Sequence, residues 1–252
     1  MATKKERKAA SERVRAMQAQ QAAAERRRRT LIVGAVVVAV IAAVVGVGIA
    51  VQSGRQGPTS GKAPAGVTSD GGVLRGGKTA PVQVVVYEDF QCPSCKAFEE
   101  NVGSTLATDV SNGQIQLEYR PVAFLDRAST TNYSSRALGT AACALDDGGP
   151  TVFTKLHDLL FTHQPAEGSA GLTDGQLADL AAEAGANKQA VASCQSAGTY
   201  DGWVAMVTDD ASKAGITGTP TYFVDGKQVS FSNTEDPKIT LTKLIDAAAA
   251  QQ

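Results

Sequence analysis

The sequence predicts an α/β domain with the element order β-α-β, a long helical segment and β-β-α, preceded by one transmembrane helix. Three features of the 252-residue chain support this prediction. An uncharged apolar run occupies residues 31–51, well before the first β-branched run at 82–87. Further β-branched and aromatic runs occur at 115–124 and 221–230. Residues 130–215 between them carry the apolar periodicity of helices.

The charge of the chain changes sign along its length. Residues 1–30 hold ten Lys and Arg against three Glu, whereas the remaining residues hold 14 basic and 22 acidic side chains. An acidic domain of this kind repels polyanions, so we do not expect nucleic acid to be a partner. We expect residues 1–30 to form a basic cytoplasmic segment, because positive charge stays on the cytoplasmic side of a membrane.

Leu31–Val51 contains twenty-one residues without a charged or strongly polar side chain. As a helix rising about 1.5 Å per residue, it would span roughly 31 Å, close to the hydrocarbon thickness of about 30 Å. We therefore predict a single-pass transmembrane helix at 31–51, with the following domain outside a bacterial cell membrane. A cleaved signal peptide ending at Gly48-Ile49-Ala50 is the alternative, although its apolar core is normally shorter, roughly 7 to 15 residues. The four cysteines would then lie in an oxidising compartment.

A glycine-rich stretch follows the apolar run. Residues 52–77 contain eight glycines and few large apolar side chains, so they bury too little surface to offset the conformational entropy lost on folding. We therefore expect a flexible linker at 52–77 and one globular domain at 78–252, a length typical of a single domain.

The domain is expected to begin with a buried central strand, because Val82–Tyr87 is too apolar on both faces for an edge. A second strand, residues 115–124, follows an Asn-Gly turn. Near the end of the chain, Asp225-Gly226 between two β-forming runs is a strong signal for a type I′ hairpin.

The predicted helices carry recognisable end signals. Thr173 and Gln176 form a capping-box pattern, and Gly185 is expected to end that helix. A further helix should end at Gly215. Asp236 precedes a proline at the start of the last helix. The apolar stripe of the helix that Thr173 caps would be Leu177, Leu180, Ala181 and Ala184. The stripe of the last helix would be Leu241, Leu244, Ile245 and Ala248.

The stretch "YEDFQCPSCKAFEE", residues 87–100, places two cysteines where the first strand gives way to a helical pattern. A structural zinc site normally needs two close pairs of ligands, whereas the other cysteines, Cys143 and Cys194, stand alone. A structural disulfide between Cys92 and Cys95 would close too small a ring to constrain the unfolded chain much. The pattern therefore favours redox chemistry, without a metal.

Cys92 is expected to cap the helix that Pro93 begins. Its sulfur would then face the unpaired N–H groups and the positive dipole end of the helix, which favour a thiolate. Cys95, one turn further on, should be more buried. This asymmetry suits thiol exchange, because an exposed sulfur of low pKa reacts with the substrate and a second sulfur closes the internal disulfide. The buried stripe of this helix would be Phe98, Val102 and Leu106.

Three features occur together and in this order along the chain: a strand followed by "CPSC", two cysteines in the helical segment, and "GITGTPTYFVDG" before the last hairpin. With these features, residues 78–252 resemble a DsbA-like thiol:disulfide oxidoreductase, a thioredoxin fold with an inserted all-helical subdomain. The resemblance implies that Thr219-Pro220 forms the second half of the site. The bond before Pro220 would be cis and would pack against the active cysteines, leaving the Thr219 backbone free to pair with a substrate strand.

Two departures from the family pattern concern the surroundings of the cysteines. Family members often keep a buried carboxylate six residues before the first cysteine, where this chain has Val86. Glu88 and Asp89 lie nearer in sequence and could exchange a proton with the second cysteine, or could be solvated at the strand end. The dipeptide Pro93-Ser94 lacks the histidine of the best-known oxidant, which leaves the oxidising strength open.

Cys143 and Cys194 both lie in the helical segment, and together they could form one disulfide. In the chain-entropy model, closing a loop of about fifty residues stabilises a protein by roughly 4 kcal/mol. We therefore expect a structural bridge. The alternative, a second redox pair that relays electrons, lacks the close spacing that fast exchange requires. His157 and His163 are expected to be surface or partly buried helix residues.

The resemblance implies an enzyme that passes its Cys92–Cys95 disulfide to unfolded secreted or cell-envelope proteins. A membrane partner resembling DsbB or a vitamin K epoxide reductase would reoxidise it. The chain would need no cofactor and would act as a monomer held at the membrane by its N-terminal helix. One alternative runs electrons the other way, as an extracytoplasmic reductase or isomerase. Another, from a different class, is a redox-silent peptide-binding module.

Overall fold

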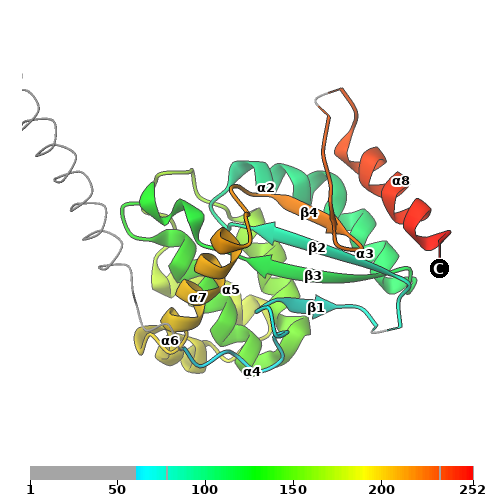
Figure 1. Cartoon of the computed structure of the whole chain (residues 1–252). Coiled ribbons are helices and arrows are strands. Elements are labelled where there is room, and N and C mark those ends of the chain that lie inside the picture. Colours follow the sequence, from blue (N-terminus) through cyan, green and yellow to red (C-terminus); the bar gives the residue numbers. More distant parts are fainter. Residues whose placement is uncertain (1–60, 78, 233, 252) are drawn as a thin grey trace, which may run out of the picture. The chain divides into compact units, whose positions relative to one another are not determined.

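The computed structural model describes residues 61–77, 79–232 and 234–251 of the chain (Figure 1). None of the helices in these ranges combines the length and the apolar character that crossing a membrane requires. The predicted basic segment at 1–30 and the predicted transmembrane helix at 31–51 lie outside the described residues.

A five-stranded mixed sheet forms the centre of the domain, in the order β1-β3-β2-β4-β5. β2 lies parallel to β3 and antiparallel to β4, so it is the central strand that its apolar sequence predicts. Asp225 and Gly226 both adopt positive φ, as the predicted hairpin between β4 and β5 requires. The strands are β1 Val73–Arg75, β2 Val82–Glu88, β3 Ile115–Pro121, β4 Thr221–Val224 and β5 Lys227–Gln228.

Helices cover both faces of this sheet (Figure 1). The chain after β2 forms one continuous helical stretch, made of α2 Pro93–Phe98, a π-helical turn η1 Glu99–Gly103, and α3 Ser104–Ser111. After β3 come a 3-10 turn η2 Phe124–Arg127 and then α4 Tyr133–Thr162, α5 Asp174–Ala184, α6 Lys188–Ser196 and α7 Asp201–Lys213. The last helix is α8 Pro237–Ala249.

The helices α4 to α7 are the predicted all-helical insertion, and the strands and helices around them have the order and pairing of the predicted thioredoxin fold. Thr173 caps α5 in a reciprocal pair with Gln176, and Gly185 ends the helix at φ 110°. α4 changes direction at Gly149, which has φ 75°. The next residue is Pro150, and the residue before a proline is disfavoured in the helical conformation.

The two faces of β2 contact different groups of residues. Val84 and Val86 belong to the main core, which also includes buried residues from each of the helices α2 to α8. Val85 and Tyr87 point to the other face and pack with Ala211 of α7 in a smaller cluster. Burial on both faces explains why the strand carries an almost continuous apolar run.

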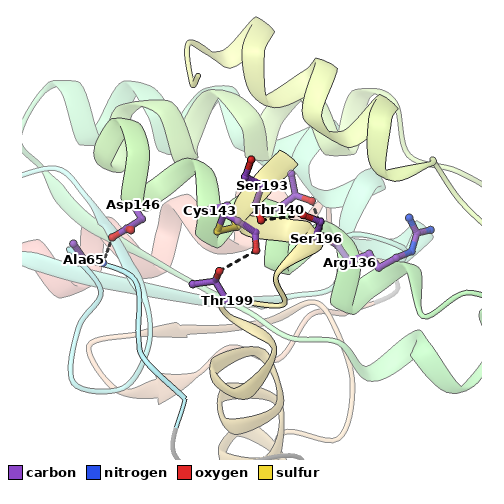
Figure 2. Close-up of a disulfide and its surroundings, with 9 residues drawn as sticks. Ala65, Arg136, Thr140, Cys143, Asp146, Ser193, Ser196 and Thr199 are labelled. Carbon is purple, nitrogen blue, oxygen red and sulfur yellow. Dashed lines mark hydrogen bonds between the residues drawn. A yellow bond between two sulfur atoms is a disulfide. The ribbon is translucent and has the colours of Figure 1, made fainter. Parts of the chain in front are cut away.

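A disulfide joins Cys143 of α4 to Cys194 of α6 (Figure 2). Thr199, just beyond α6, donates a hydrogen bond from its hydroxyl to the Cys194 carbonyl. The disulfide lies within the helical insertion, as predicted, and links two helices that the chain also connects through α5.

Three details differ from the sequence-based expectation. β1 lies within residues 52–77, the range assigned to the linker, and Val73 is fully buried there, so the folded domain begins before residue 78. β3 ends at Pro121, because Phe124 begins a 3-10 turn instead of extending the strand. On α8, Leu244 is 40% exposed, although the rest of its predicted stripe packs inward.

Candidate functional site

Cys92 and Cys95 lie at the start of α2, directly beyond the end of the central strand. Cys92 is the N-cap residue in an extended conformation, and Pro93 occupies the first helical position, as predicted. Both thiols are free in this structure. Cys92 is 7% exposed and Cys95 is 0% exposed, so the first sulfur is the accessible one.

The two thiols differ strongly in acidity. The pKa of Cys92 is lowered to about 6 because the Cys95 thiol hydrogen-bonds to its sulfur, with further help from the Thr219 side chain and the N–H groups of Cys95 and Ser94. Partial burial opposes this shift. The pKa of Cys95 is raised far above its usual range by burial, by its hydrogen bond to Cys92 and by the charge of Glu88.

The loop before β4 brings the second half of the predicted site to Cys92. The Thr219–Pro220 peptide bond is cis, as the family resemblance implies. In the thiol form, the Cys92 Sγ–H donates to the Thr219 carbonyl at 3.3 Å. The Thr219 side chain is one of the groups that lower the pKa of Cys92, after the Cys95 thiol. Thr219 therefore lies directly beside the reactive sulfur.

The connector between α4 and α5, residues 163–173, is tied to the chain around the cysteines. Gln164 donates from Nε2 to the carbonyls of Phe90 and Cys92 at 3.1 and 3.0 Å. In return, Gln91 donates from Nε2 to the Ala166 and Ser169 carbonyls at 3.3 and 3.2 Å. The helical insertion is thus coupled to the redox pair through side-chain amides, which the sequence pattern did not indicate.

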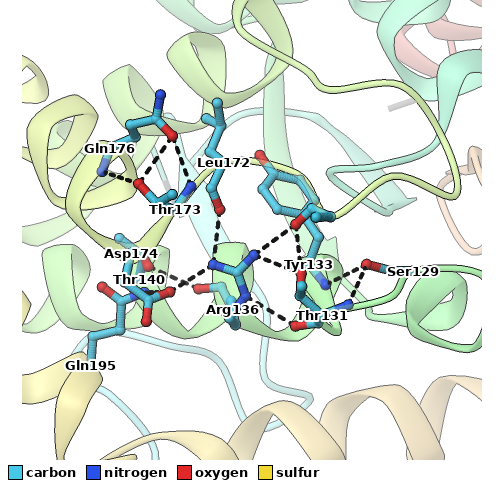
Figure 3. Close-up of polar contacts among 11 residues, drawn as sticks. Ser129, Thr131, Tyr133, Arg136, Thr140, Leu172, Thr173, Asp174, Gln176 and Gln195 are labelled. Carbon is cyan, nitrogen blue, oxygen red and sulfur yellow. Dashed lines mark hydrogen bonds and ion pairs between the residues drawn. The ribbon is translucent and has the colours of Figure 1, made fainter.

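Arg136 holds the far end of this connector (Figure 3). Its guanidinium donates to the Leu172 and Ala170 carbonyls, both at 2.9 Å, and pairs with Asp174 at 2.6 Å. It also donates from Nε to the Thr131 carbonyl at 3.0 Å. These contacts fix the connector against the start of α4.

Asp89 is fully buried, so the expectation that it could be solvated at the strand end is wrong. Its carboxylate accepts hydrogen bonds from the Gln91 N–H, the Leu125 N–H and the Ser134 hydroxyl at 2.9, 2.9 and 2.5 Å. Burial raises its pKa to about 6 in spite of these donors. The carboxylate joins three segments around the cysteines, which is a structural task.

Glu88 is also buried, at 2% exposure, and its charge raises the pKa of Cys95. Its Oε2 lies 2.9 Å from Nε2 of His157, which is 1% exposed and not the surface or partly buried residue that was expected. Nδ1 of His157 lies 3.1 Å from Asp158 Oδ1. Burial opposes protonation of His157, but the hydrogen bonds to Asp158 and Glu88 and the nearby carboxylates raise its pKa to about 10.

The sequence did contain a signal for the buried histidine. Phe153, His157 and Phe161 are spaced four residues apart on α4, so they share one helix face. The rings of both phenylalanines lie near the imidazole, and Tyr119 of β3 lies closer still, with 4.3 Å between ring centroids. His163 lies at the exposed end of α4 and belongs to no such face.

The chain is similar to known thiol:disulfide oxidoreductases. A family model described as thioredoxin matches residues 68–247. The structure of reduced DsbG from Mycobacterium tuberculosis is 32% identical, with a TM-score of 0.60 over 71% of this chain and 92% of that one. Oxidised DsbA from the same organism is also 32% identical, with a TM-score of 0.59 over 71% of this chain and 98% of that one.

Two curated relatives each match about two thirds of this chain. The serine/threonine-protein kinase PknE of Mycobacterium tuberculosis is 33% identical over 173 residues, which are 66% of this chain and 30% of the kinase. The matched region therefore spans less than a third of that protein. Disulfide bond formation protein D of Bacillus subtilis is 29% identical over 167 residues, which are 65% of this chain and 72% of the relative.

Proposed function

This chain belongs to the thioredoxin family and is a DsbA-type thiol:disulfide oxidoreductase, and from that membership we propose that it introduces disulfide bonds into secreted or cell-envelope proteins. The observation that carries the proposal is the contrast between its two cysteines. Cys92 combines access with a pKa of about 6, whereas Cys95 is fully buried and its pKa is raised. Donors of disulfides need a first sulfur that is a good leaving group as a thiolate.

The reaction begins from the Cys92–Cys95 disulfide. A substrate thiolate attacks Cys92 Sγ, the bond between the two cysteines breaks, and Cys95 leaves with the electron pair and takes up a proton. Glu88, whose charge acts on Cys95, is the proposed group for this proton transfer. Asp89 is the weaker candidate, because three donors already occupy its carboxylate.

The second step releases the oxidised substrate. Another substrate thiolate attacks the substrate sulfur of the mixed disulfide, and Cys92 leaves as a thiolate that its low pKa stabilises. Two electrons have then moved from the substrate to the cysteine pair, so the reaction itself needs no cofactor. The backbone of Thr219, beside Cys92, is the proposed docking point for the substrate chain.

We place this reaction outside the cytoplasm, with the chain held at the membrane by residues 31–51. Support comes from the length of that apolar run and the basic residues before it. The Cys143–Cys194 disulfide is a further support, because such bonds persist in oxidising compartments. The proposed reoxidant is a membrane protein resembling DsbB or a vitamin K epoxide reductase.

Trapping of mixed disulfides tests the assignment of roles. Cys95→Ser removes the thiol that resolves the intermediate, so this variant should accumulate covalent complexes with secreted proteins in the producing cell. Cys92→Ser, the matched control, should form none. Complexes on Cys92→Ser alone would reverse the roles of the two cysteines.

A reduction-potential measurement tests the direction of electron flow. Because the Cys92 thiolate is stabilised, the reduced state is favoured and the pair should be more oxidising than thioredoxin, which lies at about −270 mV. Equilibration with glutathione, read by mass spectrometry of the alkylated forms, gives the value. A potential at or below that of thioredoxin would make the chain a reductase.

A further inference from the structure

A buried cluster of metal-ligating groups includes Glu88, the proposed proton-transfer group for Cys95, together with two residues that have no part in the exchange steps above. Glu88 ends β2, Glu99 begins η1 and His157 lies on α4, so three separate elements supply the side chains. One carboxylate oxygen of each glutamate and one ring nitrogen of the histidine all lie within 4.8 Å of one another. His157 is 69 positions from Glu88 in the sequence, and no metal site was predicted for these residues.

Two oxygen atoms in this cluster lack a partner. Glu88 Oε1 and Glu99 Oε1 are buried and accept no hydrogen bond from the described residues. Glu88 as a whole is 2% exposed. A buried carboxylate oxygen without a donor is costly, and a bound cation is one way in which proteins satisfy it. The two oxygens without a partner therefore point to a bound ligand, independently of which residue types form the cluster.

The orientation of His157 fits metal coordination. Nδ1 is 3.1 Å from Asp158 Oδ1, which leaves Nε2 directed at the glutamates, 2.9 Å from Glu88 Oε2. Metal-binding histidines commonly place their other ring nitrogen against a carboxylate in this way. The rings of Phe90, Tyr119 and Phe161 surround the imidazole and shield it from water.

A surface cavity gives the cluster an entry path and room for further ligands. It has a volume of about 420 Å³, and Glu99 and Asp158 line it together with Glu100. Gly103 also lines it, and a Cβ at this position would lie 2.8 Å from Glu99 Oε2, so the glycine leaves space for the carboxylate. Water could complete the coordination from the cavity side.

We propose that Glu88, Glu99 and His157 form a site for one first-row divalent cation, which enters from this cavity and is oriented by Asp158. Two carboxylates and one imidazole suit Mn²⁺, Fe²⁺ or Zn²⁺.

Direct binding to the oxidised full-length chain tests the site. In that form all four cysteines are in disulfides, so no thiolate competes for the metal. We expect one equivalent of Mn²⁺ to bind, seen as loss of the free-ion electron paramagnetic resonance signal, and Zn²⁺ to displace it. The chain is first stripped of metal with a chelator. If neither ion binds saturably, the proposal is wrong.

Variants assign the binding to these residues. Asp158→Asn should weaken the affinity about 10- to 100-fold, as loss of an orienting partner does, and Glu99→Gln should weaken it more. Glu100→Gln, an exposed neighbour on the same cavity, is the matched control and should leave the affinity unchanged. Gly103→Ala keeps every charge but crowds Glu99, so it should also weaken binding. Equal affinity in Glu99→Gln and the unaltered chain would overturn the proposal.

Discussion

Cys92 shows how much a single position at a helix start can change a thiol. Its pKa of about 6 predicts that the reduced chain reacts with iodoacetamide with half-maximal rate near pH 6 and a plateau at higher pH. Alkylation rates between pH 4 and 9, read by mass spectrometry at Cys92, measure the value. A midpoint near 9, the ordinary value for this group, would contradict the proposed stabilisation.

The same shift predicts a pH dependence of stability. The folded pKa of Cys92 is depressed, so the thiolate's contribution to the stability of the reduced chain is complete above about pH 9 and is lost as the pH falls through about 6. The free energy of unfolding of the reduced chain, minus that of the oxidised chain, should therefore rise between pH 6 and 9. Urea unfolding of both forms at several pH values measures this difference.

A substitution of Thr219 tests directly one cause of the low pKa of Cys92. Thr219→Val removes the hydroxyl that favours the Cys92 thiolate, so the pKa of Cys92 should rise and the alkylation midpoint should move to higher pH. Thr221→Val is the matched control, because its hydroxyl donates to the Gly218 carbonyl in the same loop and not to the sulfur. An equal shift in both variants would mean that loop distortion, and not the hydrogen bond, sets the pKa.

At the scale of elements, the connector between α4 and α5 depends on Arg136. Arg136→Lys keeps the charge but loses the planar set of donors, so the free energy of unfolding should fall by about 1–3 kcal/mol. Hydrogen exchange should also increase in residues 163–173. Arg127→Lys, which loses one exposed bond to the Phe124 carbonyl, is the control and should change stability by less than about 0.5 kcal/mol.

The elements with strong local signals were predicted from the sequence, and those without were not. The central strand, the Asp225-Gly226 hairpin and the capped helix α5 each carry their own pattern of apolar, turn or capping residues. β1 is three residues long and lies among glycines, and it is held by pairing with β3, which is distant in sequence. Such pairing leaves no local period to detect.

In the candidate site too, the residues with local sequence signals were predicted and those brought together by packing were not. Cys92 and Cys95 could be placed because helix capping is a local property. The meeting of Thr219 with Cys92 followed from family resemblance and not from any local pattern, since the two residues are 127 positions apart. The partnership of Glu88 with His157 was missed, because it spans 69 positions and comes from packing α4 against the sheet.

At the scale of the whole molecule, the Cys143–Cys194 disulfide constrains the helical insertion and lies outside the redox pair. The double change Cys143→Ala and Cys194→Ala should lower the free energy of unfolding by up to roughly 4 kcal/mol, because the loop it closes, with a sequence separation of 51, becomes free in the unfolded chain. Thiol exchange by Cys92 should persist. Loss of exchange in a folded double variant would instead support an electron relay.

The predicted membrane topology is tested by reporter fusions to the chain. An alkaline phosphatase fused after residue 60 should be active, because the predicted helix at 31–51 places that point outside the cytoplasm. A reporter that works only in the cytosol should be silent at the same point. A mature chain that begins near Val51 would show that the apolar run is a cleaved signal peptide.

The position of β4 beside β2 has a consequence for how the protein is made. The strand that brings Thr219 to Cys92 follows the whole helical insertion, and it pairs with a strand synthesised long before it. At about 5–20 residues per second, roughly 6 to 25 s of translation separate Cys95 from Pro220. During this interval the nascent chain carries both thiols without the loop against which Cys92 rests. The reactive centre can therefore mature only after the helical insertion and β4 have been synthesised.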